Sequence, residues 1–413
     1  MAKADKRNII SSAELADSHE RLCHPIPMAE LQRRWAAIRA RMSDAKIDAL
    51  VIQGSNNLTG TAGYYRWFTG ISVASSYPQT VIFPLEGLMT LVGHGQFNED
   101  KKFDGKNPVL PGIGRRLGTP AFPSVNYTYG YEAELIGQEI KKSSYRTVGF
   151  VAPNNMYFGF GTKLKELLTG VTFIDVTEMV DPIKAVKSAE EINLIRRTAA
   201  MQDEVVAKIR EHIRPGMKDF EVMAYGRYLG DLLGSETGYF LGSSAPPGQP
   251  AAVLRRAEQG REIHKGDILF FQAENSGPGG YFTHLGRMIV LGKAPQQLVH
   301  AFGQMVEAED FTLTLLKPGA SCREIFKEYN DYMRKHGFSE EGRAHCHGQG
   351  YDLVERPLIR NDETMTIAEN MNLGLHPHMS NERMFVQLTD NFLIGPGGKI
   401  EHLHKTPREI IEV

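Results

Sequence analysis

Cysteine is scarce in this chain of 413 residues, which contains only Cys23, Cys322 and Cys346. Three cysteines so far apart do not make a disulfide framework, and their small number favours a reducing compartment. Long apolar runs are missing as well, since none approaches the roughly 18 residues that a membrane span needs. The first 20 residues lack the apolar stretch of a signal peptide. We therefore expect a cytoplasmic protein without a membrane-spanning segment.

An excess of charge of one sign is also lacking. Lys and Arg together number 47 and Asp and Glu 49, which gives a formal net charge of −2. Such a balance provides no general attraction to nucleic acid or to an acidic membrane, so we expect neither as a partner. The content of 41% hydrophobic and 23% charged residues is ordinary for a globular protein. The length allows two or three domains with a large core.

The first part of the chain alternates between helical and strand patterns. Residues 1–24 are polar and are expected to form an N-terminal arm, and apolar residues at helical spacing predict a helix that begins at Met28. Strand patterns follow at residues 49–52, 80–83, 88–92, 146–151 and 171–176. This alternation predicts an α/β domain over residues 25–184.

One segment of this domain is unusually aromatic for the loop that its flanking glycines indicate. Residues 60–70 contain Tyr64, Tyr65, Arg66 and Trp67. Such a segment fits a packed corner of the domain. It fits equally a pocket lid or a subunit interface, where aromatic side chains and arginine are common.

The second part of the chain, residues 185–413, contains an internal repeat. Ser188 and Glu191 form a capping-box pattern that opens a helix running to about Ile213. The same order of elements occurs twice: a long helix, a Pro-Gly pair, a shorter helix and then strands. A second capping-box pattern lies at Ser321 and Glu324. The repeat predicts a duplicated α+β unit with pseudo-twofold symmetry.

A hairpin lies at the centre of this second domain. Residues 268–273 form an apolar run, residues 277–280 a glycine-rich turn, and residues 281–291 a second strand. Gln272 and Glu274 lie two residues apart and share one face of their strand, and His284 lies just past the turn, within reach across the hairpin. The alternative is an exposed hairpin face whose polar residues are solvated.

The hairpin sequences GDILFFQ and GGYFTHLGR resemble the central hairpin of the pita-bread family. That family includes methionine aminopeptidase, aminopeptidase P, prolidase and creatinase. The resemblance implies a creatinase-like protein with an α/β N-terminal domain and an α+β pita-bread C-terminal domain. It also implies a homodimer in which the N-terminal domain of one subunit reaches toward its partner's active site, where Tyr64 and Arg66 would contact the substrate.

The same resemblance indicates that the metal ligands of the family's peptidases are largely replaced. Gln272 and His284 stand where those enzymes have aspartates, while Arg287 matches a family arginine. His376 and Thr389 stand in place of two glutamates. The segment from His345 to Gly350 resembles the family's Gly-His-Gly segment and keeps its histidine as His347, and Glu355 is kept although Val354 replaces the histidine before it.

A pocket made of these residues would offer one carboxylate and three imidazoles. Two divalent ions that share a site need several anionic oxygens, so a dinuclear peptidase site is disfavoured. We therefore expect an enzyme without a cofactor that hydrolyses a C–N bond in a small non-peptide molecule. The expected acid–base residues are His284, His347, His376 and Glu355, and the expected substrate-binding residues are Gln272, Glu274, Arg287, Thr389, Tyr64 and Arg66.

Alternatives to this hypothesis remain open. His284, His347 and His376, with Glu274, could instead hold a single zinc or iron ion and catalyse a hydrolysis or a lyase elimination. The domain could also have lost catalysis and bind a peptide or protein. The resemblance to creatinase also implies that creatine is an unlikely substrate, because residues 243–250 lack the histidine that creatinase uses as its acid–base group. Catalysis by histidine predicts a pH–rate profile with a limb near neutrality.

Overall fold

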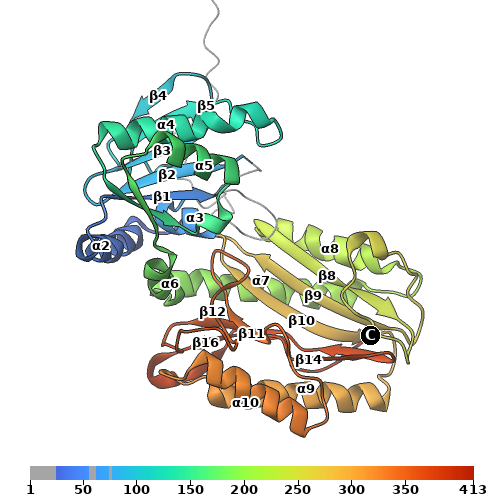
Figure 1. Ribbon diagram of the computed structural model, residues 1–413. Helices are drawn as coiled ribbons and strands as arrows, with labels where there is room; N and C mark the ends of the chain where they lie inside the picture. The colour runs from blue at the N-terminus through green and yellow to red at the C-terminus, as the bar shows by residue number, and fades with distance from the viewer. Residues whose placement is uncertain (1–24, 55–61, 74–76) are drawn as a thin grey trace, which may run out of the picture. The chain divides into compact units, whose positions relative to one another are not determined.

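The computed structural model describes residues 25–54, 62–73 and 77–413. The chain divides into two compact units, of which the first ends at Lys184 and the second begins at Ala185 (Figure 1). The expected N-terminal arm, residues 1–24, and Cys23 lie outside the described residues. Cys322 and Cys346 are both buried and free. No helix in the described ranges is long and apolar enough to cross a membrane.

The N-terminal unit is built on a seven-stranded sheet with the strand order β4-β5-β3-β2-β1-β6-β7. Its strands are β1 (Ala49–Gly54), β2 (Gln79–Pro84), β3 (Met89–His94), β4 (Glu99–Lys102), β5 (Ile113–Thr119), β6 (Thr147–Val151) and β7 (Thr172–Asp175). Its helices are α2 (Met28–Asp44), α3 (Gly63–Thr69), α4 (Gly130–Lys142), α5 (Phe158–Leu167) and α6 (Thr177–Ala185). The predicted helix begins at Met28, and β2 and β3, which contain most of the strand patterns at residues 80–83 and 88–92, pair antiparallel.

The aromatic segment is a helix, so the expectation of a loop was wrong. Residues Gly63–Thr69 form α3, which ends at Gly70 in the left-handed conformation with φ of 68°. Tyr65, Trp67 and Phe68 are buried, so their packing stabilises a helix that is too short to persist alone. The two glycines mark the ends of this helix, and Gly70 supplies the positive φ that stops it.

The C-terminal unit contains the predicted repeat of two helices followed by strands. The first copy comprises α7 (Ala189–His212), α8 (Asp219–Leu232), β8 (Thr237–Ala245), β9 (Ile268–Ser276) and β10 (Phe282–Val290). The second begins with α9 (Gln296–Leu315) and α10 (Cys322–Lys335). Its strands are β11 (Cys346–Gly348), β12 (Glu355–Leu358), β13 (Asn372–Leu375), β14 (His378–Asn381), β15 (Met384–Gln387), β16 (Asp390–Ile394) and β17 (Ile400–His402), and β18 (Ile411–Glu412) ends the chain.

Two sheets of this unit carry most of the predicted active-site residues. One has the strand order β18-β10-β9-β8, and the other has the order β12-β11-β13-β16-β17. Figure 1 shows α7 and α8 with the yellow strands of the first copy, and α9 and α10 with the orange-to-red strands of the second. Both hydrogen bonds of the capping box form between Ser188 and Glu191. In the second capping box, one of the two bonds forms: the Ser321 hydroxyl accepts from the amide of Glu324 at 3.4 Å.

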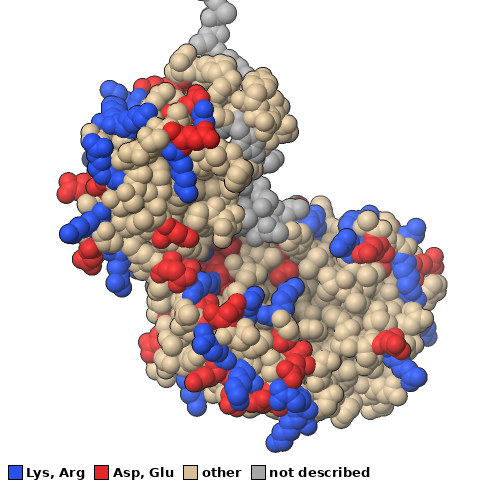
Figure 2. Space-filling view, viewed as in Figure 1, with Lys and Arg blue, Asp and Glu red and all other residues tan. Residues whose placement is uncertain are grey.

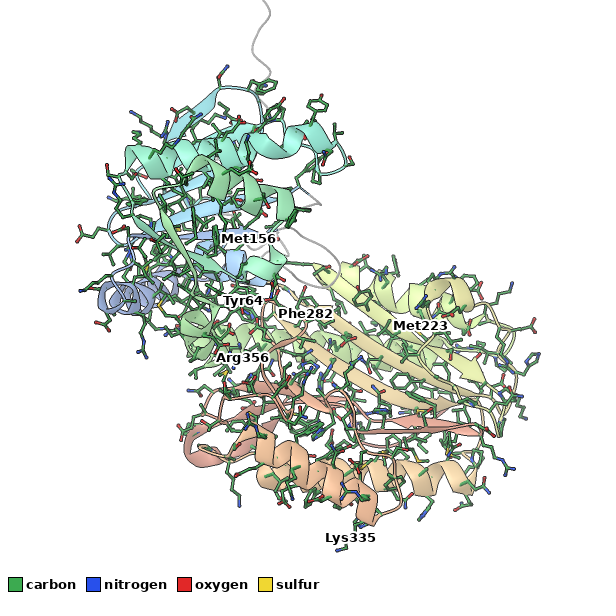
Figure 3. All side chains as sticks on the ribbon, in the orientation of Figure 1. Tyr64, Met156, Met223, Phe282, Lys335 and Arg356 are labelled. Carbon is green, nitrogen blue, oxygen red and sulfur yellow. The ribbon has the colours of Figure 1, made fainter. Side chains whose placement is uncertain are left out.

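The hairpin of β9 and β10 is enclosed on both faces. Phe270 and Met288 pack in a hydrophobic core cluster with residues of α9, while Phe271 and Ile289 pack in another with residues of α7 and α8. This burial rules out the alternative of a solvated hairpin face. Phe282, labelled in Figure 3, marks the start of β10. Polar residues on these strands are therefore held inside the unit.

Candidate active site

The hairpin brings its acidic and imidazole side chains together. β9 and β10 pair antiparallel, with Glu274 directly opposite His284 and Gln272 directly opposite Gly286. The side chain of His284 is fully buried, and its Nδ1 lies 3.7 Å from Oε1 of Glu274. This strand pairing places the single carboxylate beside an imidazole.

Two further histidines complete a three-histidine cluster of His284, His347 and His376. The ring centroid of His284 lies 5.4 Å from that of His347 and 5.6 Å from that of His376, and the last two are 5.2 Å apart. His347 comes from β11, and His376 directly follows β13. His376 is only partly buried, which leaves the cluster open to a ligand at that ring.

The position of His284 depends on a close approach to the neighbouring sheet. A Cβ atom at Gly374 would lie 2.1 Å from Nε2 of His284, so only glycine fits at this point of β13. The backbone amide of His284 donates to Oδ1 of Asn391 at 2.8 Å. Asn391 in turn donates to Oε1 of Gln349 and Oδ1 of Asn372. Sequence analysis did not single out Gly374 or Asn391.

Burial keeps two imidazoles of the cluster, those of His347 and His376, uncharged. Burial, followed by the neighbouring His284, lowers the pKa of His347 to about 4. Burial and the two other rings of the cluster lower the pKa of His376 well below its ordinary value. Burial tends to raise the pKa of Glu274, but the neighbouring imidazole of His284 outweighs burial, so this pKa is lowered. Near neutral pH, Glu274 is therefore ionised while His347 and His376 are neutral.

The hydrogen bonds of the rings define which nitrogens can react. Nδ1 of His347 lies 2.9 Å from the carbonyl oxygen of Gly348, an acceptor, so this nitrogen carries the proton and Nε2 carries the lone pair. Both ring nitrogens of His284 are buried without a hydrogen-bond partner among the described residues. Buried polar atoms are rarely left in this state, which points to a ligand of this site.

With this geometry in place, comparison with known proteins identifies the protein family. Residues 34–186 match the Creatinase/Prolidase N-terminal domain, and residues 193–396 match Metallopeptidase family M24. The chain belongs to the pita-bread family. The pita-bread resemblance expected from the hairpin sequences is thereby confirmed, together with the fold class.

Relatives within the pita-bread family include enzymes of different specificity. The chain is 24% identical to the ectoine hydrolase of Halomonas elongata over 408 residues, which cover 94% of this chain and 98% of that one. It is 23% identical to the creatinase of a Bacillus species over 386 residues, or 90% and 87% of the two chains. The solved prolidase of Thermococcus sibiricus superposes with a TM-score of 0.76 at 17% identity, over 93% and 99% of the chains.

Neutral side chains occupy two of the acidic ligand positions implied by the pita-bread resemblance. Oε1 of Gln272 accepts a hydrogen bond from the Thr389 hydroxyl at 2.9 Å and another from Nε2 of Gln387 at 2.8 Å. Gln387 also donates to the Thr389 hydroxyl. These three side chains form a bonded group of amides and a hydroxyl at the edge of the cluster. Gln387 was missed by sequence analysis because its role depends on this contact.

Arg287 and Glu355 make contacts outside the three-histidine cluster. All five N–H groups of Arg287 donate hydrogen bonds, one to Asp390 and four to the backbone carbonyls of Gly286, Thr389, Thr406 and Pro407. Glu355 accepts from Nζ of Lys187 at 2.8 Å and from the amide of Asp352 at 3.1 Å. Substrate binding by Arg287 and acid–base catalysis by Glu355 stay predictions that these contacts do not favour.

Tyr64 and Arg66 both lie on α3 in the N-terminal unit. The Tyr64 hydroxyl donates to Oδ1 of Asp181 at 2.5 Å, and Nζ of Lys184 lies 4.9 Å from the centre of the Tyr64 ring. These contacts fix Tyr64 within its own unit. The contribution of both residues to a partner's active site stays a prediction.

Cavity size alone does not locate the active site. A cavity of about 910 Å³ in the C-terminal unit is lined by α7 and the C-terminal segment, including Arg210, Lys405 and Ile411. None of the predicted catalytic or binding residues lines it. The charged side chains of both signs are interspersed on the visible face of each unit in Figure 2. The buried histidines are therefore the stronger indication of chemistry.

Proposed function

We propose that this chain is a creatinase-like hydrolase that cleaves a C–N bond in a small non-peptide molecule by histidine acid–base catalysis. The observation that carries the proposal is the three-histidine cluster, with ring centroids 5.2 to 5.6 Å apart beside the carboxylate of Glu274. Ectoine hydrolase and creatinase, two non-peptide C–N hydrolases, are relatives that align along most of the chain.

The pair of metal ions implied by a metallopeptidase family does not fit the residues of this site. Bridging carboxylates normally neutralise two adjacent divalent ions, and carboxylates supply most of their oxygen ligands. The residues at the corresponding positions offer one carboxylate, that of Glu274, while Gln272 and Thr389 bind each other. This donor set supports a reaction that proceeds without a dinuclear centre.

The orientation of His347 suggests how the reaction proceeds. Its Nε2 carries the lone pair and can accept a proton from a water molecule as the water oxygen attacks the carbon of the C–N bond. The imidazolium so formed, or His376 after proton exchange, then donates that proton to the departing nitrogen. Glu274 is ionised and lies in the same cluster, so it stabilises the positive charge while the proton is held.

A substrate screen tests the proposal directly. The purified full chain would be incubated with amides, amidines and cyclic ureas, and release of ammonia or amine would be measured. We expect turnover of at least one compound, lost by about a hundredfold or more in His347→Gln, since general acid–base catalysis contributes about 10²–10⁴-fold. Hydrolysis of Xaa-Pro dipeptides, with no turnover of the small molecules, would overturn the proposal.

A single metal ion in the three-histidine cluster is the second hypothesis. The observation that favours it is that both ring nitrogens of His284 are buried without a hydrogen-bond partner among the described residues, although Nδ1 lies 3.7 Å from Oε1 of Glu274. Such an ion would be held by His284, His347, His376 and Glu274, and as zinc or iron it would activate water for hydrolysis or assist a lyase elimination. Elemental analysis of the untagged protein and of His284→Ala and His376→Ala separates this hypothesis from metal-free catalysis.

A further inference from the structure

A buried carboxyl group on α9 lies close to the buried Asp390 of β16. Glu309 lies on α9, and neither its side chain nor that of Asp390 is exposed to solvent. Ala308, the residue before Glu309, packs in one hydrophobic cluster with Leu388, two residues before Asp390. The charge of Asp390 acts on the Glu309 carboxyl group. Two carboxyl groups are therefore held near each other where bulk water does not screen them.

Each of the two carboxyl groups has one oxygen without a donor. Oε1 of Glu309 and Oδ2 of Asp390 are fully buried and have no hydrogen-bond partner among the described residues. A buried carboxylate oxygen in this state is costly. Two carboxylates that are close together and buried also repel each other, so one of them is expected to stay protonated. A proton on Oε1 of Glu309 would make that atom a donor, which is the group that Oδ2 of Asp390 lacks.

The neighbouring arginines decide which of the two groups carries the proton. Oδ1 of Asp390 accepts from Nη2 of Arg287 at 2.9 Å, and Arg287 is completely buried. Glu309 shares its arginine: Nη1 of Arg408 donates to Oε2 of Glu309 at 3.0 Å and to Oδ1 of Asp310 at 2.6 Å. The Arg408 side chain is 28% exposed, so solvent weakens its effect. Asp390 is therefore the ionised member of the pair, and Glu309 is the protonated one.

The pKa values of the two groups follow the same order. Burial, followed by the negative charge of Asp390, raises the pKa of Glu309 well above its ordinary value, against the opposing effect of Arg408. Burial tends to raise the pKa of Asp390 as well, but Arg287 and the bond to His402 outweigh it, so this pKa is lowered. The other titratable groups nearby are uncharged at neutral pH, because burial lowers the pKa of an imidazole and raises those of a phenol and a thiol: His404, Tyr329 and Cys346.

Both chain neighbours of Asp390 support active-site residues. The hydroxyl of Thr389 donates to Oε1 of Gln272, and Oδ1 of Asn391 accepts from the backbone amide of His284. A displacement of Asp390 would therefore move the side chains that hold Gln272 and His284. The protonation of Glu309 is in this way connected to the geometry of the three-histidine cluster.

We propose that Glu309 carries a proton at neutral pH and that loss of this proton at alkaline pH forces Asp390 and β16 away from α9, which disturbs the active site. The ionised Glu309 would lie near an ionised Asp390, and Arg408 would then compensate both Glu309 and Asp310. The stability that the neutral acid contributes is complete below the unfolded pKa of a glutamate and is lost as the pH rises through the raised pKa. This switch acts through the fold, so it does not depend on which substrate the site takes.

Infrared spectroscopy of the full chain tests the protonation of Glu309. The C=O stretching band of a neutral carboxyl group is distinct from the bands of a carboxylate. The parent protein for this measurement carries Glu132→Gln, because burial also raises the pKa of Glu132, to about 7. We expect a neutral-carboxyl band at neutral pH that disappears at alkaline pH and is missing after Glu309→Gln. Asp310→Asn removes the exposed carboxylate that shares Arg408, and this control should keep the band.

Amide hydrogen exchange measures the effect on the active site without a substrate. At the alkaline pH where the band has disappeared, peptides that contain β10 and β16 should exchange faster in the parent protein than after Glu309→Gln, whose amide cannot ionise. At neutral pH the two proteins should exchange at equal rates, and Asp310→Asn should match the parent at both pH values. A band that is absent at neutral pH, or that persists until the protein unfolds, overturns the proposal, and so do equal exchange rates at alkaline pH. The pH titration of the parent protein decides the protonation even if Glu309→Gln does not fold.

Discussion

Nη2 of Arg287 lies 2.9 Å from Oδ1 of Asp390, and both side chains are completely buried. Removal of one partner from a buried ion pair leaves the other charge without compensation, at a cost of about 3–5 kcal/mol. Arg287→Ala would in addition remove one hydrogen-bond donor from each of four backbone carbonyls. We therefore expect Arg287→Ala to lower the free energy of unfolding by at least that amount in denaturant titrations.

An exposed pair on the same unit provides the control for this loss. Arg196 and Glu401 form a salt bridge at 2.7 Å, with side chains 47% and 41% exposed. Exposed ion pairs contribute about 0.2–1 kcal/mol, so Arg196→Ala should barely shift the denaturation midpoint. If the two substitutions lowered the free energy of unfolding equally, burial of Arg287 would not determine how much its ion pair contributes to stability.

The tight contact between Gly374 and His284 leads to a second prediction. Gly374→Ala places a methyl group where Nε2 of His284 now lies, so the imidazole must move. We expect a large fall in kcat with the fold retained, measured on whichever substrate the screen identifies. Gly303→Ala on α9 meets no atom within 4 Å and should leave kcat unchanged. Full activity of Gly374→Ala would show that His284 is not a catalytic residue.

The pH dependence of the reaction follows from the buried position of His347. Its pKa is lowered to about 4, so its neutral, proton-accepting form predominates above that value. We expect kcat/KM to fall as the pH falls through about 4, well below the limb near neutrality that an unperturbed histidine would give. A thermal unfolding series at the same pH values is needed to separate protonation of His347 from acid unfolding. A limb that stays near pH 6.5 would exclude His347 as the base.

The raised pKa of the buried Glu132 carboxyl in the N-terminal unit leads us to expect a stability that depends on pH. Burial raises its pKa to about 7, against the opposing hydrogen bonds from Thr80 and Gln53. A carboxyl whose folded pKa exceeds its unfolded one contributes stability that is complete below about pH 4.5 and is lost as the pH rises through about 7. The shift corresponds to about 3 kcal/mol.

Substitution of Glu132 checks this dependence. Wild-type protein should lose thermal stability between about pH 5 and pH 8, whereas Glu132→Gln, which cannot ionise, should lose much less over the same range. Glu134→Gln, on the exposed side of the same helix, is the control and should follow the wild type. Parallel curves for wild type and Glu132→Gln would contradict a raised pKa.

A homodimer with shared active sites can be tested by complementation. If Arg66 of one subunit acts in the partner's site, Arg66→Ala and His347→Ala are each inactive as pure dimers. Dimers that contain one chain of each kind then have one site with both residues intact, and activity returns on mixing or coexpression. Independent subunits would give no recovery, and the oligomeric state follows from light scattering of the same samples.

Patterns within short stretches made much of the fold predictable from the sequence. The turn at residues 277–280 between two apolar runs predicted the hairpin in which Glu274 lies opposite His284. The capping box at Ser188 marked the start of α7 to the residue. These features depend on neighbouring residues, so local propensity and periodicity suffice to predict them.

The remaining features depend on contacts between distant segments. α3 is stabilised by burial of Tyr65, Trp67 and Phe68, and its seven residues show no helical period of their own. The need for glycine at position 374 arises only when β13 packs against His284. The contact between His402 and Asp390 forms because β17 pairs with β16, which spacing along the chain alone does not specify.

The side-chain hydrogen bonds of Asn391 run to two other side-chain amides and to one backbone amide. Asn391, Asn372 and Gln349 bind one another, and Gln272, Gln387 and Thr389 form a similar group nearby. None of these groups gains or loses a proton in the range where histidines titrate. The hydrogen bonds between these side chains therefore do not change with pH in that range, whereas the protonation of the neighbouring histidines does. Asn391→Asp replaces an amide with an acid of the same shape. It would make the hydrogen bonds around this residue depend on pH.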